Sequence, residues 1–460
     1  MHFNLYHWFR AVLFFFILLL LCSIYFNDLL NHPLHMDEHE WVRRGAVFFE
    51  KYFIDIDFSE RTWKSYEGYD QFMFAQYVYG AWMKYQFKDD LMSVFQQVSY
   101  NQGWEGSEGD SALWSDDKWW IRYSNFQNQF SHIPFFYRPA FQLIVLNRYV
   151  SVFFAMGILG LMYLIGLRLS NYWVGIFAMI MLAMNSLFYW LMRQAMLEAV
   201  PLFFNLLLLW VYLILHQHMS RWRVRLLIGL FAGLAVSSKV TGAIFVLGIF
   251  FVETFRFLRI IWGLSLVSLT KPCFLFMQRQ LSWLLVALGV LFILNPVLWG
   301  NPIMSLQTMV EQRIWHLSYQ SENYPQYYHP SIADRLQSIY AMVVAYDAPL
   351  SEIRLSIPRW HELRTLFLII GLLHVTWIVF DKKKLQSHYW AICGLVFLTV
   401  YFTLGLFLVV GFDRYYLPLI PFIILVTALG LWTFLHGLAD MSTFCISLVR
   451  KSFGGISHPR

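Results

Sequence analysis

Long apolar runs, separated by short loops that carry Lys and Arg, constrain the fold of this chain more than any other feature. A run of about 20 apolar residues spans the roughly 30 Å hydrocarbon core of a bilayer, and a helix satisfies its own backbone there. Hydrophobic residues make up 58% of the chain, which argues against a soluble enzyme. The sequence therefore predicts an all-α polytopic membrane protein. Its spanning runs are 11–29, 142–166, 172–191, 196–215, 281–299, 365–380, 389–411 and 415–437.

Residues 226–255 form a further apolar run, which Lys239 interrupts near its middle. A lysine facing lipid there costs about 2.5–3.5 kcal/mol, so the run is either one flawed span or two short ones. The positive-inside rule favours two, because only then do the basic clusters, Lys382 to Lys384 included, share the cytoplasmic side. The prediction is about ten spans with both termini cytoplasmic, in a plasma (inner) membrane or an endoplasmic-reticulum-type membrane.

Residues 1–437 are expected to form a single membrane domain with two large external loops. The first loop, 30–137, is acidic on balance and rich in Trp, Tyr and Phe, and the second, 300–363, carries aromatic and proline-containing segments. Such composition is typical of helices that lie at the membrane interface. Residues 438–460 are predicted to be a short basic cytoplasmic tail.

The net charge of +6 comes largely from these short loops, which carry topology information rather than a nucleic-acid footprint. Membrane lipids are therefore expected partners and nucleic acid is not. The four cysteines have no paired spacing, so they suggest neither a disulfide framework nor a thiolate metal site.

In the ten-span topology, ionisable residues at the ends of different helices all face the external side. Charged residues from several helices that converge on one membrane face indicate a site at the outer interface. The residues concerned are Asp37, Glu38, Glu40, Arg138, Arg193, Glu198, Lys239, Asp413 and Arg414.

Three carboxylates, Asp37, Glu38 and Glu40, directly follow the first span. A partly desolvated carboxylate beside another can act as a general base that activates a hydroxyl. The alternative is that an interfacial helix begins here, with acidic residues in its first turn. His35 and His39 are four residues apart, but no second His or Cys group matches them, so zinc is disfavoured. We expect no cofactor and no metal, although carboxylate-held magnesium or manganese is less implausible than zinc.

Basic residues near the same face suit an anion. Arg138 precedes Pro139 at the entrance of the second run, where its guanidinium is placed to bind phosphate or to reach lipid headgroups. Lys239 lies at the tips of two interrupted helices, an arrangement used by membrane binding sites for anions. Arg193 and Glu198 bracket a turn and are either site residues or a structural ion pair, and Arg414 has the same two readings.

Several short motifs, in this order and spacing, resemble one enzyme family. They are the acidic pair after the first span, Arg138-Pro139, Asn147-Arg148, the segment Met192 to Glu198, Ser238 to Gly242, and Arg414 to Pro421. The family is that of the polyprenyl-phosphate-sugar-dependent glycosyltransferases of the GT-C class, which includes protein O-mannosyltransferases and lipid A aminoarabinose transferases. The sequence departs from it in having Glu at 198, Ala140-Phe141 after the Arg-Pro pair, and a long first loop.

The resemblance implies an inverting transfer of a sugar from a polyprenyl-phosphate donor to a hydroxyl of a protein, lipid or glycan acceptor on the external face. It implies that Asp37 is the general base and that Glu38 or Glu40 orients sugar or acceptor. By the same analogy Glu198 contacts sugar or acceptor, and Arg138 and Lys239 bind the donor phosphate.

Two other functions fit parts of the pattern. A transporter or flippase of lipid-linked glycans would explain the broken helix at Lys239, but it would need ionisable residues at mid-membrane depth and related halves. An oligosaccharyltransferase-like enzyme shares the topology and would need a metal on the external carboxylates.

Overall fold

The computed structural model describes residues 5–30, 32, 35, 37–87, 139–262, 269–341, 360–380, 387–407 and 410–453. Within these ranges the regular structure is helical, apart from one isolated bridge between Tyr328 and Val410. The first half contains α1 (Leu5–Phe26), α2 (Glu38–Phe49), η1 (Glu50–Ile54), α3 (Glu60–Trp63), α4 (Tyr66–Asp70), α5 (Phe74–Phe87), α8 (Pro139–Leu169), α9 (Tyr172–Ala183), α10 (Ser186–Met192), α11 (Ala199–Leu215) and η4 (His216–His218). The second half contains α12 (Trp222–Ser238), α13 (Thr241–Ile261), α14 (Thr270–Leu294), η6 (Pro296–Leu298), α15 (Pro302–Asn323), η7 (Pro325–Tyr327), α16 (Ile332–Tyr340), α17 (Trp360–Phe380), α18 (Ser387–Phe407), η9 (Asp413–Leu419) and α19 (Ile420–Phe453).

Seven helical segments among the described residues are long and apolar enough to cross a membrane, and the bent pair α9–α10 would make eight. These eight correspond to the eight uninterrupted runs of the sequence, although the α14 segment begins earlier, at Thr270. The remaining two predicted spans are α12 and α13, which are shorter or more charged. The polytopic helical fold is therefore confirmed, and the count of ten stays a prediction.

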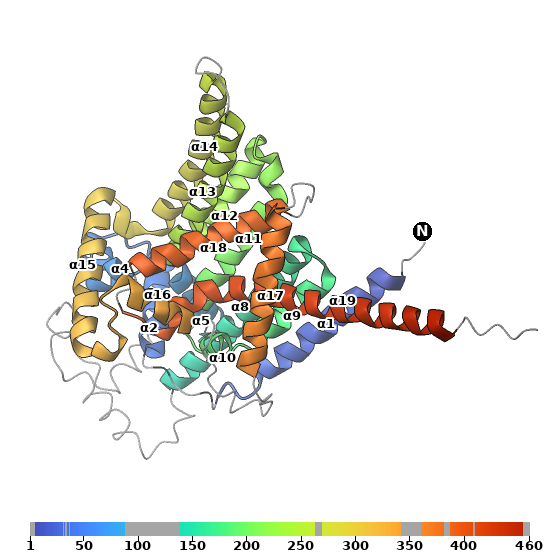
Figure 1. Cartoon of the computed structure of the whole chain (residues 1–460). Helices are drawn as coiled ribbons and strands as arrows, with labels where there is room; N and C mark the ends of the chain where they lie inside the picture. Colours follow the sequence, from blue (N-terminus) through green and yellow to red (C-terminus); the bar gives the residue numbers. More distant parts are fainter. Residues whose placement is uncertain are drawn as a thin grey trace, which may run out of the picture.

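The largest apolar core lies among α8, α9, α11 and the C-terminal helices (Figure 1). Helix α19 packs against α17 and α9, while α11 packs against α8 and α12. Tyr25 fixes α1 to this bundle, because its buried hydroxyl donates to the carbonyl of Ala183 at 2.9 Å. The long C-terminal part of α19 runs outward from the bundle in Figure 1.

The break at Lys239 is a sharp turn between two separate helices. Helix α12 ends at Ser238, Lys239 is extended, and α13 begins at Thr241. A Cβ on Gly242 would lie 2.2 Å from the carbonyl oxygen of Ala235, so only glycine permits this close return. The predicted interruption of the run is confirmed, and it places Lys239 at a helix end.

The described part of the first loop forms a small helical unit of α2 to α5. Helices α2 and α5 cross at Gly45 and Gly80, where a Cβ on Gly80 would lie 2.2 Å from the Gly45 carbonyl oxygen. The second loop contributes α15, which contacts α4, and α16, which contacts α18. The described residues of both predicted loops therefore contain helices, and the loops' external position stays a prediction.

Candidate active site

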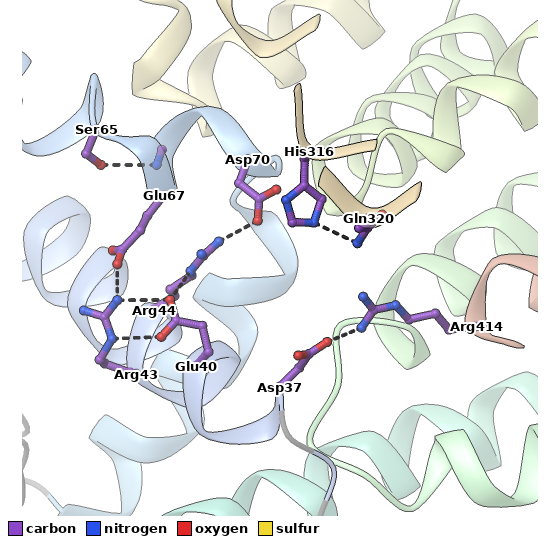
Figure 2. Close-up of polar contacts among 11 residues, drawn as sticks. Asp37, Glu40, Arg43, Arg44, Ser65, Glu67, Asp70, His316, Gln320 and Arg414 are labelled. Atoms are coloured by element: carbon purple, nitrogen blue, oxygen red, sulfur yellow. Dashed lines mark hydrogen bonds and ion pairs between the residues drawn. The ribbon is translucent and has the colours of Figure 1, made fainter. Parts of the chain in front are cut away.

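Two ion pairs between distant segments define the candidate active site. Asp37 is the N-cap residue of α2, and its carboxylate forms an ion pair with the guanidinium of Arg414 at the start of η9 (Figure 2). The two side chains are 29% and 18% exposed, so the pair remains accessible from outside the protein.

The second ion pair joins the start of α11 to the end of α12. Glu198 is the N-cap residue of α11, and its Oε1 accepts a hydrogen bond from Lys239 Nζ at 2.6 Å. Burial raises the pKa of Glu198, but the positive charges of Lys239 and Arg414 outweigh it and lower the pKa. Because Arg414 and Asp37 both act on Glu198, the two ion pairs lie within electrostatic reach of each other.

Glu38 and Arg148 form a fully buried pair behind this site. Arg148 donates to both oxygens of Glu38, at 2.8 and 2.7 Å, and also to the carbonyls of Leu29 and His32. Glu38 in turn accepts from the backbone N–H of Ala195 at 2.6 Å. The pair therefore joins four segments: α8, which carries Arg148, the residues that follow α1, the start of α2, and the loop that leads to Glu198.

Arg193 fastens the same loop from its other end. Its guanidinium is almost completely buried, donates to the carbonyl of Asn27 at 2.5 Å, and lies over the ring of Tyr189 with 4.8 Å between guanidinium carbon and ring centroid. These contacts are with the protein itself. The structure thus places Glu38 and Arg193 in the framework that surrounds Asp37 and Glu198.

Glu40 belongs to a chain of charges that links α2 to α4. It accepts hydrogen bonds from Arg43 and Arg44, Arg43 also bonds to Glu67, and Arg44 bonds to Asp70 at 2.7 Å (Figure 2). The acidic first turn of α2, predicted as the alternative to a catalytic role, is present. The helix-start interpretation did not include the Glu38–Arg148 contact, or the link from Glu40 to α4 that passes through Arg43 and Arg44.

Helix α15 borders the candidate site and contributes residues that the sequence analysis did not identify. Arg313 donates to the hydroxyl of Tyr415 at 3.0 Å, and His316 lies between Asp70 and Gln320 in Figure 2. Burial lowers the pKa of His316, and the nearby Arg313 and Arg414 lower it further, against the opposite effect of Asp70. The spacing of Arg313, His316 and Gln320 on one helix face was the available signal.

The structure thus brings Asp37, Glu198, Lys239 and Arg414 together, as the one-sided topology predicted. Arg138 lies outside the described residues. Within the described ranges, no group of three or more His, Cys, Asp and Glu side chains is placed to hold a metal ion. Arg148 could have been singled out from sequence, because an arginine inside an apolar run is expected to have a buried partner.

The sequence of the central part of the chain is similar to one known family. Residues 117–303 match the family model described as dolichyl-phosphate-mannose-protein mannosyltransferase. The match covers about two fifths of the chain. The matched region contains Arg138, Arg148, Glu198 and Lys239, whereas Asp37 and Arg414 lie outside the matched residues. The predicted resemblance to a polyprenyl-phosphate-sugar glycosyltransferase family is thus confirmed over residues 117–303.

Solved structures of membrane transferases resemble this chain only distantly. ArnT from Cupriavidus metallidurans, bound to undecaprenyl phosphate, gives 11% identity and a TM-score of 0.47 over 97% of this chain and 66% of that one. An oligosaccharyltransferase from Archaeoglobus fulgidus gives 12% identity and a TM-score of 0.40 over 71% of this chain. This chain spans 43% of the archaeal enzyme's length. A comparison with curated protein sequences returned no match.

Proposed function

We propose that the chain transfers a sugar, with inversion, from a polyprenyl-phosphate donor to a hydroxyl acceptor at the external membrane face. The observation that supports this most is the meeting of the Asp37–Arg414 and Glu198–Lys239 pairs at helix ends from four segments. Displacement at an anomeric carbon needs a base on the acceptor side and positive charge where the phosphate departs. The two pairs supply both kinds of group.

Asp37 is the general base in this proposal. Its carboxylate accepts the proton of the acceptor hydroxyl while the hydroxyl oxygen bonds to the anomeric carbon and the carbon–phosphate oxygen bond breaks. Arg414 orients the carboxylate and favours its ionised form, because an adjacent positive charge stabilises a carboxylate. The partial exposure of Asp37 leaves the acceptor a direct approach.

Lys239 and Arg414 are proposed to bind the donor phosphate, with Arg138 as a third cation. Lys239 lies where α12 ends and α13 begins, so helix-end groups and the ammonium ion are available to the same anion. Glu198 would then share Lys239 with the phosphate and contact the sugar or the acceptor. The lipid tail of the donor stays in the bilayer, which explains a site at helix ends.

Glu38, Arg193 and Glu40 have supporting roles in the proposal. Glu38 and Arg193 hold the loop of Glu198 against the segment that carries Asp37, as their buried contacts indicate. Glu40 keeps α2 fixed to α4 through Arg44 and Asp70. None of the three needs to touch the substrate for its loss to reduce activity.

Purified protein in liposomes, supplied with undecaprenyl-phosphate mannose and a panel of peptide, lipid and glycan acceptors, tests the proposal. The wild type should release undecaprenyl phosphate, and Asp37→Asn should reduce turnover at least about 100-fold, the usual contribution of a general base. Glu311→Gln on the exposed face of α15 serves as the matched carboxylate control. Full turnover in Asp37→Asn would contradict the base assignment. Movement of the intact donor across the bilayer, without release of the lipid phosphate, would instead support a flippase.

A further inference from the structure

The segment at the end of η1 exposes apolar side chains that the proposed mechanism does not use. Four side chains in a stretch of six residues are 41–66% exposed, and they are Phe53, Ile54, Ile56 and Phe58. The segment lies between α2 and α3, outside the apolar runs that are predicted to span the membrane. Exposed apolar groups gathered on one loop indicate a surface that contacts another apolar body.

The backbone at Ile56 has a conformation that its own side chain disfavours. The φ angle of Ile56 is +52°, and Asp28 is the only other non-glycine residue with a positive φ in the described part of the chain. A β-branched residue is rare in this left-handed region, whereas Asn and Gly adopt it more readily. Ile56 is also the most exposed of the four side chains, so burial within the protein does little to offset the strain. An apolar contact outside the protein would offset it.

Hydrogen bonds and ring contacts fix the segment to the last turn of α14. The Tyr52 hydroxyl donates to the carbonyl of Ile293 at 2.7 Å. Trp299 Nε1 donates to the carbonyl of Phe292, also at 2.7 Å, so both bonds satisfy carbonyls at the helix end. The ring of Phe58 lies against that of Trp299, with 4.7 Å between their centroids. The exposed segment is therefore level with the C-terminal end of α14.

Helix α14 presents an apolar stripe that ends at this point. It is among the described helices that are long and apolar enough to cross a membrane, and little of it is buried. Exposed apolar side chains follow one another along it at intervals of three or four residues, at Phe274, Met277, Leu281, Leu285, Leu288 and Phe292. Such a stripe on the outer side of a spanning helix faces lipid. The segment continues the stripe through Trp299, an aromatic residue of the kind enriched where a span leaves the hydrocarbon.

The charged residues of the segment are compatible with a lipid surface, because they are paired locally. Lys51 forms ion pairs with Asp55 at 2.9 Å and with Asp57 at 3.7 Å. Asp57 also accepts hydrogen bonds from the backbone N–H of Ser59 at 3.0 Å and from the hydroxyl of Thr62 at 2.9 Å. Charged groups of this kind lie at the level of the lipid headgroups while neighbouring apolar side chains reach the acyl chains.

We propose that residues 53–58 are a membrane anchor, whose apolar side chains enter the outer leaflet of the bilayer beside α14. Lipid is the occupant because the segment extends the lipid-facing stripe of a spanning helix. The anchor does not depend on the proposed function. It has a consequence for that function, however, because α2 and η1 run on from each other and Asp37 is the N-cap residue of α2. The anchor fixes the far end of the helix that begins at the proposed base.

Nitroxide labels measure the depth of the segment directly. Single cysteines are introduced as Ile54→Cys and Ile56→Cys in the full chain, with its four native cysteines replaced by serine, and the labelled protein is placed in phosphatidylcholine liposomes. Both labels should lie about 5–10 Å below the lipid phosphates, the depth of interfacial apolar groups, and should collide more with oxygen than with a water-soluble nickel complex. Leu285→Cys on the α14 stripe is the lipid reference, and Glu322→Cys at an exposed position of α15 is the aqueous reference.

Ile56→Asn separates the lipid contact from folding. Asn tolerates a positive φ better than Ile, so the Tm in detergent should be unchanged or raised. In liposomes, the label of Ile54→Cys should become more accessible to the nickel complex when Ile56→Asn is added, because the anchor has lost apolar surface. Ile332→Asn, at an exposed isoleucine that begins α16, is the matched control and should leave the depth of the label unchanged.

The outcomes distinguish lipid from other occupants. Labels at 54 and 56 that are as accessible to the nickel complex as the label at 322 would overturn the proposal. Dipolar broadening between labels on two copies of the chain would also overturn it, in favour of self-association. The depth measurement needs no substrate, so a protein that transfers no sugar but shows both labels below the phosphates would overturn the proposed function and support the anchor.

Discussion

Glu38 is the residue whose sequence and structural interpretations differ most. Its position in an acidic cluster suggested chemistry, yet it is fully buried and holds Arg148 with both oxygens. A buried pair of this kind contributes little net stability by itself, but loss of one partner leaves an uncompensated charge. We infer that the role of Glu38 is to fix the distance between Asp37, the preceding residue, and the loop that carries Glu198.

A charge-removal series tests this role. Glu38→Gln should destabilise the protein by about 3–5 kcal/mol and reduce transfer, because the guanidinium of Arg148 remains buried without its counter-charge. Combining it with Arg148→Met should recover most of the stability, since both charges are then gone, but not the activity. Thermal unfolding and transfer rates measured in parallel decide the matter. Full recovery of activity in the double variant would show that the pair does not position the site.

His316 predicts a pH dependence on the acid side. Its pKa is lowered by burial and by Arg313 and Arg414. The imidazole therefore stays neutral at pH values somewhat below about 6.5, the ordinary pKa of histidine. A lowered histidine pKa gives stability that is complete above about pH 6.5 and declines as the pH falls toward the folded-state value, because the unfolded chain binds the proton more readily. Between pH 6.5 and 5, the free energy of unfolding of the wild type should therefore fall more steeply than that of His316→Gln. Parallel pH profiles would contradict the assignment.

At the scale of elements, the turn at Lys239 is the feature that sequence predicted best. The lysine and Gly242 interrupt an apolar run, and the structure resolves that run into α12 and α13. What sequence did not supply is the pairing of Lys239 with Glu198, because a contact over 41 residues depends on how α11 and α12 pack. The packing of α5 against α2 could not be predicted from the sequence for the same reason.

The two-span interpretation of α12 and α13 makes a topological prediction. Ser220 before α12 and Trp262 after α13 should both lie on the cytoplasmic side, and Asn301 should lie outside. Single cysteines at these positions, in a chain with its four native cysteines replaced by serine, can be labelled with a membrane-impermeant maleimide from either side. Only the cysteine at 301 should react from outside. Labelling of residues 220 and 262 from opposite sides would show that the run crosses once.

At the scale of the whole molecule, hydrophobicity and charge placement predicted a polytopic helical protein with charged residues on one face. Asp37, Glu198, Lys239 and Arg414 were found because helix ends on one side of a membrane must lie near one another. His316 was not, since only its burial and its partners single it out. Arg148 did carry a sequence signal, because it is an arginine inside an apolar run. Sequence patterns report which face a residue occupies, whereas tertiary packing decides whether its side chain turns to substrate or to protein.

The two site cations within the described residues, Lys239 and Arg414, are each paired with a carboxylate, and this has a consequence for the proposed turnover. A donor phosphodiester carries one negative charge, whereas the monoester released after transfer carries about 1.5 to 2 near neutral pH. A site of cations alone would therefore retain its product more strongly than its substrate. In the proposed reaction Asp37 and Glu198 compete for Arg414 and Lys239, so the spent lipid phosphate would meet a nearly neutral site, which favours its departure. The carboxylates would then serve the cycle twice, in the chemical step and in product release.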